Sequence, residues 1–283
     1  MKKVRDIFCV LLLLCTTMSC ENWLDVDPKT EIKSELMFQS ESGFKDALMG
    51  VYLTLRDPEL YGKEATWGFV DAIGQQTDIQ DQAAAYYNAS RYNYSQTSGV
   101  SDALWAKAFN AIVNLNNMLE NLDEQQNLFT PATYGVLKGE ALGLRAFLHF
   151  DLLRLFGPVY KTHKEDKSIC YNTQFSLSGS DLLPASKVME YVIADLKEAE
   201  KRLAKDPIIE EGPLLSDGAT EEEDFWRYRS LRLNYYAVKA LQARAYLYAE
   251  MNEDALEAAR TVVAVQEKWF PFLEYSAIVG NSK

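Results

Sequence analysis

The segment from Thr130 to Gly157 constrains the fold of this chain more than any other stretch. Its apolar residues recur at spacings of four and three, which places them on one face of a helix with 3.6 residues per turn. They are Leu137, Ala141, Leu144, Leu148, Leu152 and Leu155, with Phe147 and Phe150 widening the face. Thr130 can cap this helix, Pro131 suits its first position, and Gly157 followed by Pro158 ends it. The sequence therefore predicts a long helix that its neighbours cover on two sides.

Five further segments show the same helical period, at residues 42–56, 102–123, 186–204, 236–250 and 253–265. Ser186 and Asn252 are expected to cap the third and fifth of them. The short connection at residues 127–131 predicts an antiparallel hairpin between the second of these helices and the central one. The last two helices span about 34 residues, the length of a tetratricopeptide unit. We therefore predict an all-α fold of tetratricopeptide-like helical repeat pairs over residues 38–283, with long irregular insertions.

Polar segments separate these helices. Residues 161–184 are expected to form irregular cover, and residues 206–224, rich in Pro, Gly and acids, are expected to form a linker. Asn116 interrupts the apolar face of the helix at residues 102–123, so it should bond a neighbouring backbone if it is buried.

The segment from Leu60 to Ser101 loses helical periodicity and mixes aromatic rings with amides and carboxylates. Long segments of this kind inside a compact domain are often functional. Aromatic rings can cover the apolar face of a sugar while polar groups bond its hydroxyls. The candidates are Trp67, Tyr86, Tyr87 and Tyr92 as stacking surfaces, with Asp78, Asn88 and Arg91 as hydroxyl partners. The alternative is that these rings pack against the helices beneath them.

The N-terminus has the features of a bacterial export signal. Lys2, Lys3 and Arg5 precede an apolar run that is too short to span a bilayer. Small residues before Cys20 resemble a lipoprotein cleavage site, although Thr17 replaces the usual aliphatic residue. We expect a signal peptide at residues 1–19, a lipidated Cys20 and a tether at residues 20–37, held at a membrane by acyl chains. An ordinary secretory signal with an incidental cysteine is the alternative.

Charge and motif content narrow the function. The net charge of −12 argues against nucleic acid as a partner, because binding phosphate needs clustered Lys and Arg. Cys170 is expected to be a buried apolar residue, and His149 and His163 lack neighbours at metal-ligand spacing, so neither a metal nor another cofactor is expected. There is no Gly-rich phosphate loop, nucleophile elbow or HExxH motif, so we do not expect an enzyme; the separation of paired glycosidase carboxylates cannot be read from sequence.

The central helix also resembles a segment of the SusD/RagB family of outer-membrane nutrient-binding lipoproteins, close to "EA-x3-RA-x3-FDL-x-R-x-FG". The matching residues are Glu140, Arg145, Ala146, Phe150, Asp151, Leu152, Arg154, Phe156 and Gly157. Weaker similarity lies at Leu24, Asp25 and Pro28, at Phe44, Gly50 and Tyr52, and at Trp105, Phe109, Ile112 and Asn116. These residues identify a scaffold and not a catalytic site, and core packing or helix capping is the alternative role for each residue of the central segment.

The resemblance implies a lipid-anchored protein of the cell outer membrane that faces the cell exterior. It implies binding of an oligosaccharide or other nutrient, and a SusC-like TonB-dependent transporter as partner, with palmitate among the acyl chains at Cys20. The resemblance covers the N-terminal half of that family, so the C-terminal half is expected to be absent, through a natural short paralogue, an early stop or a fragment. A repeat module that binds only protein, or a truncated copy that binds nothing, is the alternative.

Overall fold

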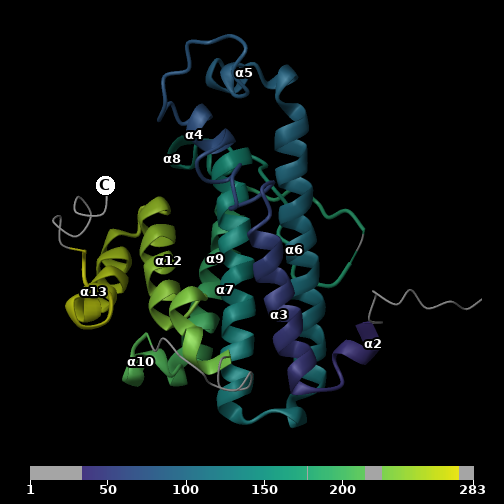
Figure 1. The fold of residues 1–283 in the computed structure, drawn as a ribbon, viewed down its shortest axis with the longest axis vertical. Coiled ribbons are helices and arrows are strands. Elements are labelled where there is room, and N and C mark those ends of the chain that lie inside the picture. Colours follow the sequence, from purple (N-terminus) through teal and green to yellow (C-terminus); the bar gives the residue numbers. More distant parts are fainter. Residues whose placement is uncertain (1–33, 177, 214–224, 274–283) are drawn as a thin grey trace, which may run out of the picture. The chain divides into compact units, whose positions relative to one another are not determined.

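The computed structural model describes residues 34–176, 178–213 and 225–273. The chain divides into two units, Met1–Met37 and Phe38–Lys283, and α2 (Ser34–Met37) is the described part of the first. The larger unit is helical (Figure 1). Its helices are α3 (Glu41–Leu55), α4 (Phe69–Ile73), α5 (Tyr87–Ser90), α6 (Ser98–Glu124), α7 (Pro131–Phe156), α8 (Tyr160–His163), α9 (Ala185–Arg202), α10 (Ile208–Glu211), α12 (Tyr235–Tyr248) and α13 (Asn252–Trp269). Short 3-10 turns lie at Tyr94–Gln96, Gln126–Leu128, Leu203–Lys205 and Tyr228–Leu231.

The all-α prediction is confirmed. The described residues contain an isolated antiparallel bridge between Lys167 and Pro184 but no strand. None of their helices combines the length and apolar character that crossing a membrane requires. The expected signal peptide, Cys20 and most of the tether lie outside the described residues, as do the final residues 274–283.

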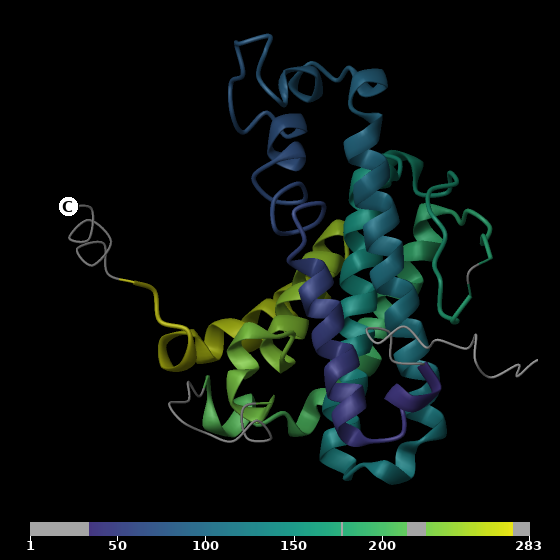
Figure 2. The ribbon, with the colours of Figure 1, turned by 45° about the vertical axis from the view of Figure 1, so that its right-hand side comes forward.

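Helix α7 is the centre of the larger unit, with α3 and α6 on one side and α9 on the other (Figures 1 and 2). Thr130 caps it as predicted, since its Oγ1 accepts a hydrogen bond from the Thr133 amide at 3.1 Å. Residues all around α7 are buried, and Leu137, Leu148 and Phe150 are almost fully removed from solvent. A helix covered on opposite sides needs apolar residues beyond one stripe, which explains its broad apolar surface.

Small residues let α7 approach α9 closely. A Cβ atom at Gly135 would lie 2.7 Å from the Arg202 carbonyl oxygen. A Cβ atom at Gly139 would lie 2.6 Å from Leu203 Cγ and 3.0 Å from the Ala199 carbonyl oxygen. Glycine at these two positions therefore sets the separation of the two helices.

The last helical pair is present as predicted. α12 and α13 pack against each other, and Ala245, Ala255 and Ala258 are buried between them and their neighbours. Small side chains at these positions allow the close crossing expected of a tetratricopeptide-like unit.

Both predicted caps on later helices are wrong. α9 begins at Ala185 directly after Pro184, which leaves Ser186 inside the first turn, where its Oγ donates to Glu165 Oε2 at 3.0 Å. α13 begins at Asn252 itself, preceded by Met251 and without a side-chain cap. In α13 the acidic residues Glu253 and Asp254 in the first turn complement the helix dipole instead.

The linker expected at residues 206–224 is only partly irregular. Its described portion contains α10, and Asp206 is 2% exposed. The Arg229 guanidinium donates from Nε to Asp206 Oδ1 at 2.8 Å and also pairs with Glu140 of α7. Asp206 is therefore a core residue. It is buried together with Glu140 because Arg229, itself buried, pairs with both carboxylates.

Candidate functional site

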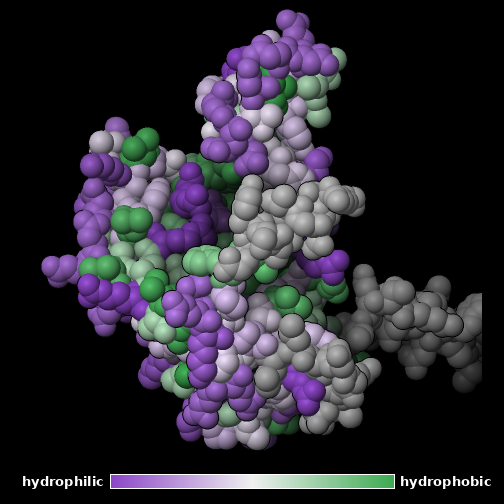
Figure 3. All heavy atoms as spheres, turned by 60° about the vertical axis from the view of Figure 1, so that its left-hand side comes forward, coloured by the Kyte–Doolittle hydropathy of each residue, from purple (hydrophilic) through white to green (hydrophobic). Residues whose placement is uncertain are grey.

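A cavity of about 690 Å³ lies between the segment at residues 60–94, α6, α7 and α12. Leu104, Leu148 and Leu152 contribute apolar wall, and the polar residues Asp71 and Asp151 also line it. Figure 3 shows, below the top of the view, a hollow that is hydrophobic in its depth and strongly hydrophilic at its edge. A concave apolar surface with a few convergent polar groups is the usual form of a small-ligand site.

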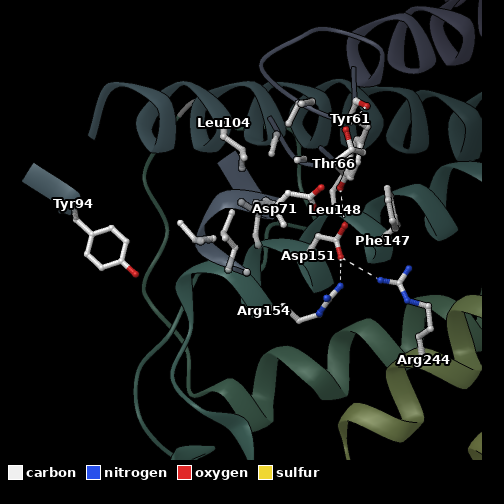
Figure 4. Close-up of a pocket in the computed structure, with 18 of the residues that line it drawn as sticks. Tyr61, Thr66, Asp71, Tyr94, Leu104, Phe147, Leu148, Asp151, Arg154 and Arg244 are labelled. Carbon is white, nitrogen blue, oxygen red and sulfur yellow. Dashed lines mark hydrogen bonds and ion pairs between the residues drawn. The ribbon is translucent and has the colours of Figure 1, made fainter. Parts of the chain in front are cut away.

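Asp151 organises the polar wall of this cavity (Figure 4). Its Oδ2 accepts a hydrogen bond from the Tyr61 hydroxyl at 3.0 Å. Its Oδ1 accepts one from Arg154 Nη1 at 2.9 Å and lies 3.7 Å from Arg244 Nη2. Burial, followed by the Asp151 charge, raises the pKa of Tyr61 well above its usual value, so the phenol remains a donor. The three groups therefore hold the Asp151 carboxylate from both of its oxygens.

The two arginines are held but not enclosed. The side chains of Arg154 and Arg244 are 44% and 52% exposed. Each guanidinium carbon lies over the Phe150 ring, at 5.5 and 5.8 Å from its centroid. A guanidinium has five N–H donors, so each side chain has donors beyond its contact with Asp151.

Tyr92 and Tyr94 line the cavity on the side of the irregular segment. Their ring centroids are 6.3 Å apart with planes tilted by 48°, and the residues are 52% and 58% exposed. Tyr92 adopts a positive φ of 57°, which is costly for a residue with a Cβ atom. Its amide donates to the Ala89 carbonyl oxygen at 3.0 Å, which closes the turn that places Tyr92 beside Tyr94.

Other candidate rings already have partners. The Tyr86 hydroxyl donates to Glu64 Oε1 at 2.9 Å. The Tyr87 ring lies under the Arg91 guanidinium, 5.4 Å from ring centroid to Cζ, and Arg91 Nη2 donates to the Ile79 carbonyl oxygen at 3.3 Å. These contacts stabilise the irregular segment itself.

The remaining candidates are exposed or partly exposed and lie outside the cavity lining. Trp67 is 68% exposed. Asp78 Oδ2 accepts from Gln80 Nε2 at 2.5 Å, and Asn88 Oδ1 accepts from Asn93 Nδ2 at 3.4 Å. Of the seven residues predicted from the sequence, the cavity thus includes Tyr92, and the roles of all seven stay predictions.

Several polar residues of the cavity were not identified from the sequence, and Asp71 is one of them. Tyr61 follows α3, Asp151 and Arg154 lie on α7, and Arg244 lies on α12, so only tertiary packing brings these four polar residues together. Asp151 and Arg154 were assigned to the scaffold. The spacing of these two along α7, at i and i+3, is the one signal that pointed to a charged pair on a common face.

The described residues contain no cluster of three His, Cys, Asp or Glu side chains suited to a metal ion. Cys170 is buried, as expected. His149 is fully buried, and its Nε2 accepts a hydrogen bond from the Asn172 amide at 3.1 Å while Nδ1 lies 2.9 Å from the Arg145 carbonyl oxygen. Burial lowers the pKa of His149 to about 3, so it is a neutral packing residue.

Comparison with known proteins adds to this geometry. The sequence profile of a SusD-like family, described as starch-binding and associating with the outer membrane, matches residues 22–247. SusD-like protein P38 of Formosa agariphila is 27% identical over 216 residues, which cover 72% of this chain and 39% of that protein. SusD-like protein P25 of the same organism is 27% identical over 163 residues, covering 55% of this chain and 31% of that protein.

Solved structures agree on the fold. A SusD superfamily protein from Bacteroides thetaiotaomicron superposes with a TM-score of 0.65 at 18% identity, over 84% of this chain and 49% of that one. A SusD-like carbohydrate-binding protein from Bacteroides vulgatus gives a TM-score of 0.65 at 19% identity, over 84% and 47%. The chain therefore spans less than half the length of these relatives.

Proposed function

Because this chain belongs to the SusD-like family of proteins that associate with the outer membrane, we propose that it captures glycans for nutrient uptake there. The cavity beside α7 is the binding site in this proposal. Tyr92 and Tyr94 offer ring faces to a sugar, and Asp71, Asp151 and the two arginines offer hydrogen-bond partners to its hydroxyls.

The observation that carries the proposal is the exposed pair Tyr92 and Tyr94 at a concave site. Both rings are more than half exposed, so a ligand that covers them removes apolar surface from water. The apolar face of a sugar can gain this binding free energy by stacking on the rings. Trp67 lies on the same irregular segment and is proposed as an outer contact for a longer glycan. No chemistry on the glycan is proposed, since the function is capture and transfer.

Delivery to a SusC-like TonB-dependent transporter is the second part of the proposal. It rests on the family and on the match over residues 22–247. Affinity purification of the chain from its native membrane, after mild crosslinking, should recover a large TonB-dependent transporter. Recovery of the chain without one would contradict this part.

Lipidation at Cys20 is the third part, and it places the protein on the outer membrane, facing the exterior. It rests on the small residues before Cys20 and on the family description. Metabolic labelling with a palmitate analogue should mark the wild-type chain and leave Cys20→Ala unmarked. Equal labelling of both would reject the anchor.

Titration calorimetry against neutral and acidic oligosaccharides, including maltoheptaose, tests glycan binding. Tyr92→Ala combined with Tyr94→Ala should weaken binding about fivefold or more, because each well-stacked ring contributes about 0.5–1.5 kcal/mol. Phe175→Ala is the matched control, because Phe175 is 46% exposed and lies outside the cavity lining. No heat with any glycan would favour a module that binds only protein.

A further inference from the structure

We propose that the cavity prefers glycans that carry an acidic group, a carboxylate or a sulfate ester, and that Arg154 and Arg244 bind this group. The inference rests on the proposed glycan-binding function and names the class of its ligand. It follows from how charge is arranged on the wall formed by α7 and α12 (Figure 4).

Two guanidiniums share one carboxylate at this wall. Arg154 and Arg244 both pair with the same oxygen of Asp151, at 2.9 and 3.7 Å. Among the described residues, neither arginine forms an ion pair with any carboxylate other than Asp151. Within ion-pair distance, two positive charges therefore face one negative charge at this wall.

The free donors of these arginines suit an oxyanion. Guanidinium presents its N–H groups in a planar fork that matches carboxylate and sulfate oxygens, and such charge-assisted bonds exceed neutral ones in strength. Neutral hydroxyls can also accept from arginine, but they use the fork less fully. An acidic ligand therefore gains more at this wall than a neutral one.

Contacts with Asp151 and Phe150 restrain the two arginines before a ligand arrives. Tyr61 donates to the other oxygen of Asp151 and packs on Phe147, with ring centroids 4.9 Å apart. Phe150 lies beneath both guanidiniums. A site with fixed donors spends less conformational entropy when it binds than one built from free surface side chains.

Because the chain as a whole is negatively charged, selectivity for an acidic group has to come from short-range contacts with Arg154 and Arg244. The whole chain carries a net charge of −12, which opposes the approach of an anion over long distances. Asp71 also lines the cavity and is suited to a hydroxyl of the sugar, not to its acidic group. The acidic group is therefore expected at Arg154 and Arg244, with the rest of the glycan toward Asp71 and the tyrosines.

Matched ligands separate charge from sugar shape. Calorimetry of the full chain with trigalacturonate and with its fully methyl-esterified form compares a carboxylate against the same sugar without charge. A sulfated galactan tetrasaccharide and its desulfated form do the same for sulfate. The acidic member of at least one pair should bind about tenfold or more tightly, and this preference should shrink with added salt.

Matched variants locate the effect. Arg244→Gln should weaken binding of the acidic ligand more than binding of the neutral ligand, and should thereby remove most of the preference. Arg260→Gln is the control, because it makes the same charge change on an exposed residue of α13 outside the cavity lining. Asp71→Asn should strengthen acidic binding, since it removes a like charge. Circular dichroism and thermal melting verify that each variant is folded.

Each outcome decides the inference. Equal affinity for acidic and neutral members of both pairs, with binding still dependent on Tyr92 and Tyr94, would overturn it and leave the proposed function standing. An equal loss in Arg244→Gln and Arg260→Gln would also overturn it, because the effect would then be one of net charge. Absence of binding to every glycan would overturn both proposals.

Discussion

The Arg145 guanidinium on α7 donates two hydrogen bonds to the Asp195 carboxylate on α9, from Nε to Oδ2 at 2.7 Å and from Nη2 to Oδ1 at 2.8 Å. Its remaining terminal nitrogen, Nη1, donates to Asn116 Oδ1 on α6 at 2.9 Å. The Tyr171 hydroxyl completes the cluster by donating to Asp195 Oδ2 at 2.7 Å. One arginine thus joins three helices and the segment that follows α8.

Removing this arginine should be strongly destabilising. Arg145→Met leaves the Asp195 carboxylate, whose side chain is 13% exposed, without its cation, and losing one partner of a buried pair costs about 3–5 kcal/mol. Urea denaturation measures the change. Lys187→Met, which breaks the exposed pair with Glu190, should cost less than about 1 kcal/mol. Equal losses in the two variants would show that the Arg145 cluster contributes nothing specific.

The protein should not tolerate even a one-atom change in the Asn116 side chain. Its Nδ2 donates to the carbonyl oxygens of Asn172 and Gln174, at 3.0 and 3.1 Å. Asn116→Asp places an oxygen against two acceptors, so the free energy of unfolding should fall by about 2 kcal/mol or more. Asn114→Asp is the matched control on the exposed side of α6 and should stay within about 0.5 kcal/mol of wild type. A small effect at Asn116 would mean that the segment at residues 172–174 is not held by these bonds.

His149 makes stability depend on pH. Its folded pKa of about 3 lies below the usual value of 6.5, so between pH 3 and pH 6.5 the unfolded chain binds a proton that the folded chain does not. This contribution is complete above pH 6.5 and is lost as pH falls toward 3. From pH 7 to pH 4.5 it should cost about 2–3 kcal/mol, at about 1.4 kcal/mol per pH unit.

His149→Gln isolates this contribution from that of the carboxylates. Glutamine can still accept from the Asn172 amide but does not titrate in this range. Unfolding free energies of the variant should therefore fall less steeply between pH 6.5 and 4.5 than those of wild type. Parallel curves for the two proteins would contradict a buried neutral histidine.

Two glycines should respond to alanine in opposite directions. In α3, a Cβ atom at Gly50 meets nothing within 4 Å, so Gly50→Ala should stabilise the protein by about 0.5–1 kcal/mol through helix propensity. In α7, Gly139→Ala should destabilise it, because the new carbon meets Leu203 and the Ala199 carbonyl oxygen. Thermal melting of both variants is sufficient, and stabilisation at Gly139 would show that α7 and α9 can move apart freely.

Much of the helical framework could be predicted because local signals specify it. The period of apolar residues locates α3, α6, α7, α9, α12 and α13 to within a few residues, and Thr130 and Pro131 mark the start of α7. The polar Asn116 on an apolar face correctly indicated a backbone bond. Ser186 misled because the first amides of α9, those of Ala185 and Ser186, donate to the backbone carbonyl oxygens of Asp166 and Lys164 and need no side-chain cap.

Pairings between distant charged residues could not be predicted. Nothing in the local sequence matches Arg145 with Asp195 fifty residues later. Asp206 lies in a stretch with the composition of a linker, yet Arg229 brings it into the core. For the same reason the sequence indicated the aromatic segment around Tyr92 but not the wall of Asp151 and Arg244, which exists only after α7 and α12 have packed.

Hydrogen–deuterium exchange of the whole chain, with and without a saturating oligosaccharide from the calorimetric panel, tests whether a glycan binds in the cavity beside α7. A glycan in the cavity should slow amide exchange in residues 60–74 and 92–96, which border it, and leave α13 unchanged. Slowed exchange confined to α13, or no change at saturation, would contradict glycan binding at this site.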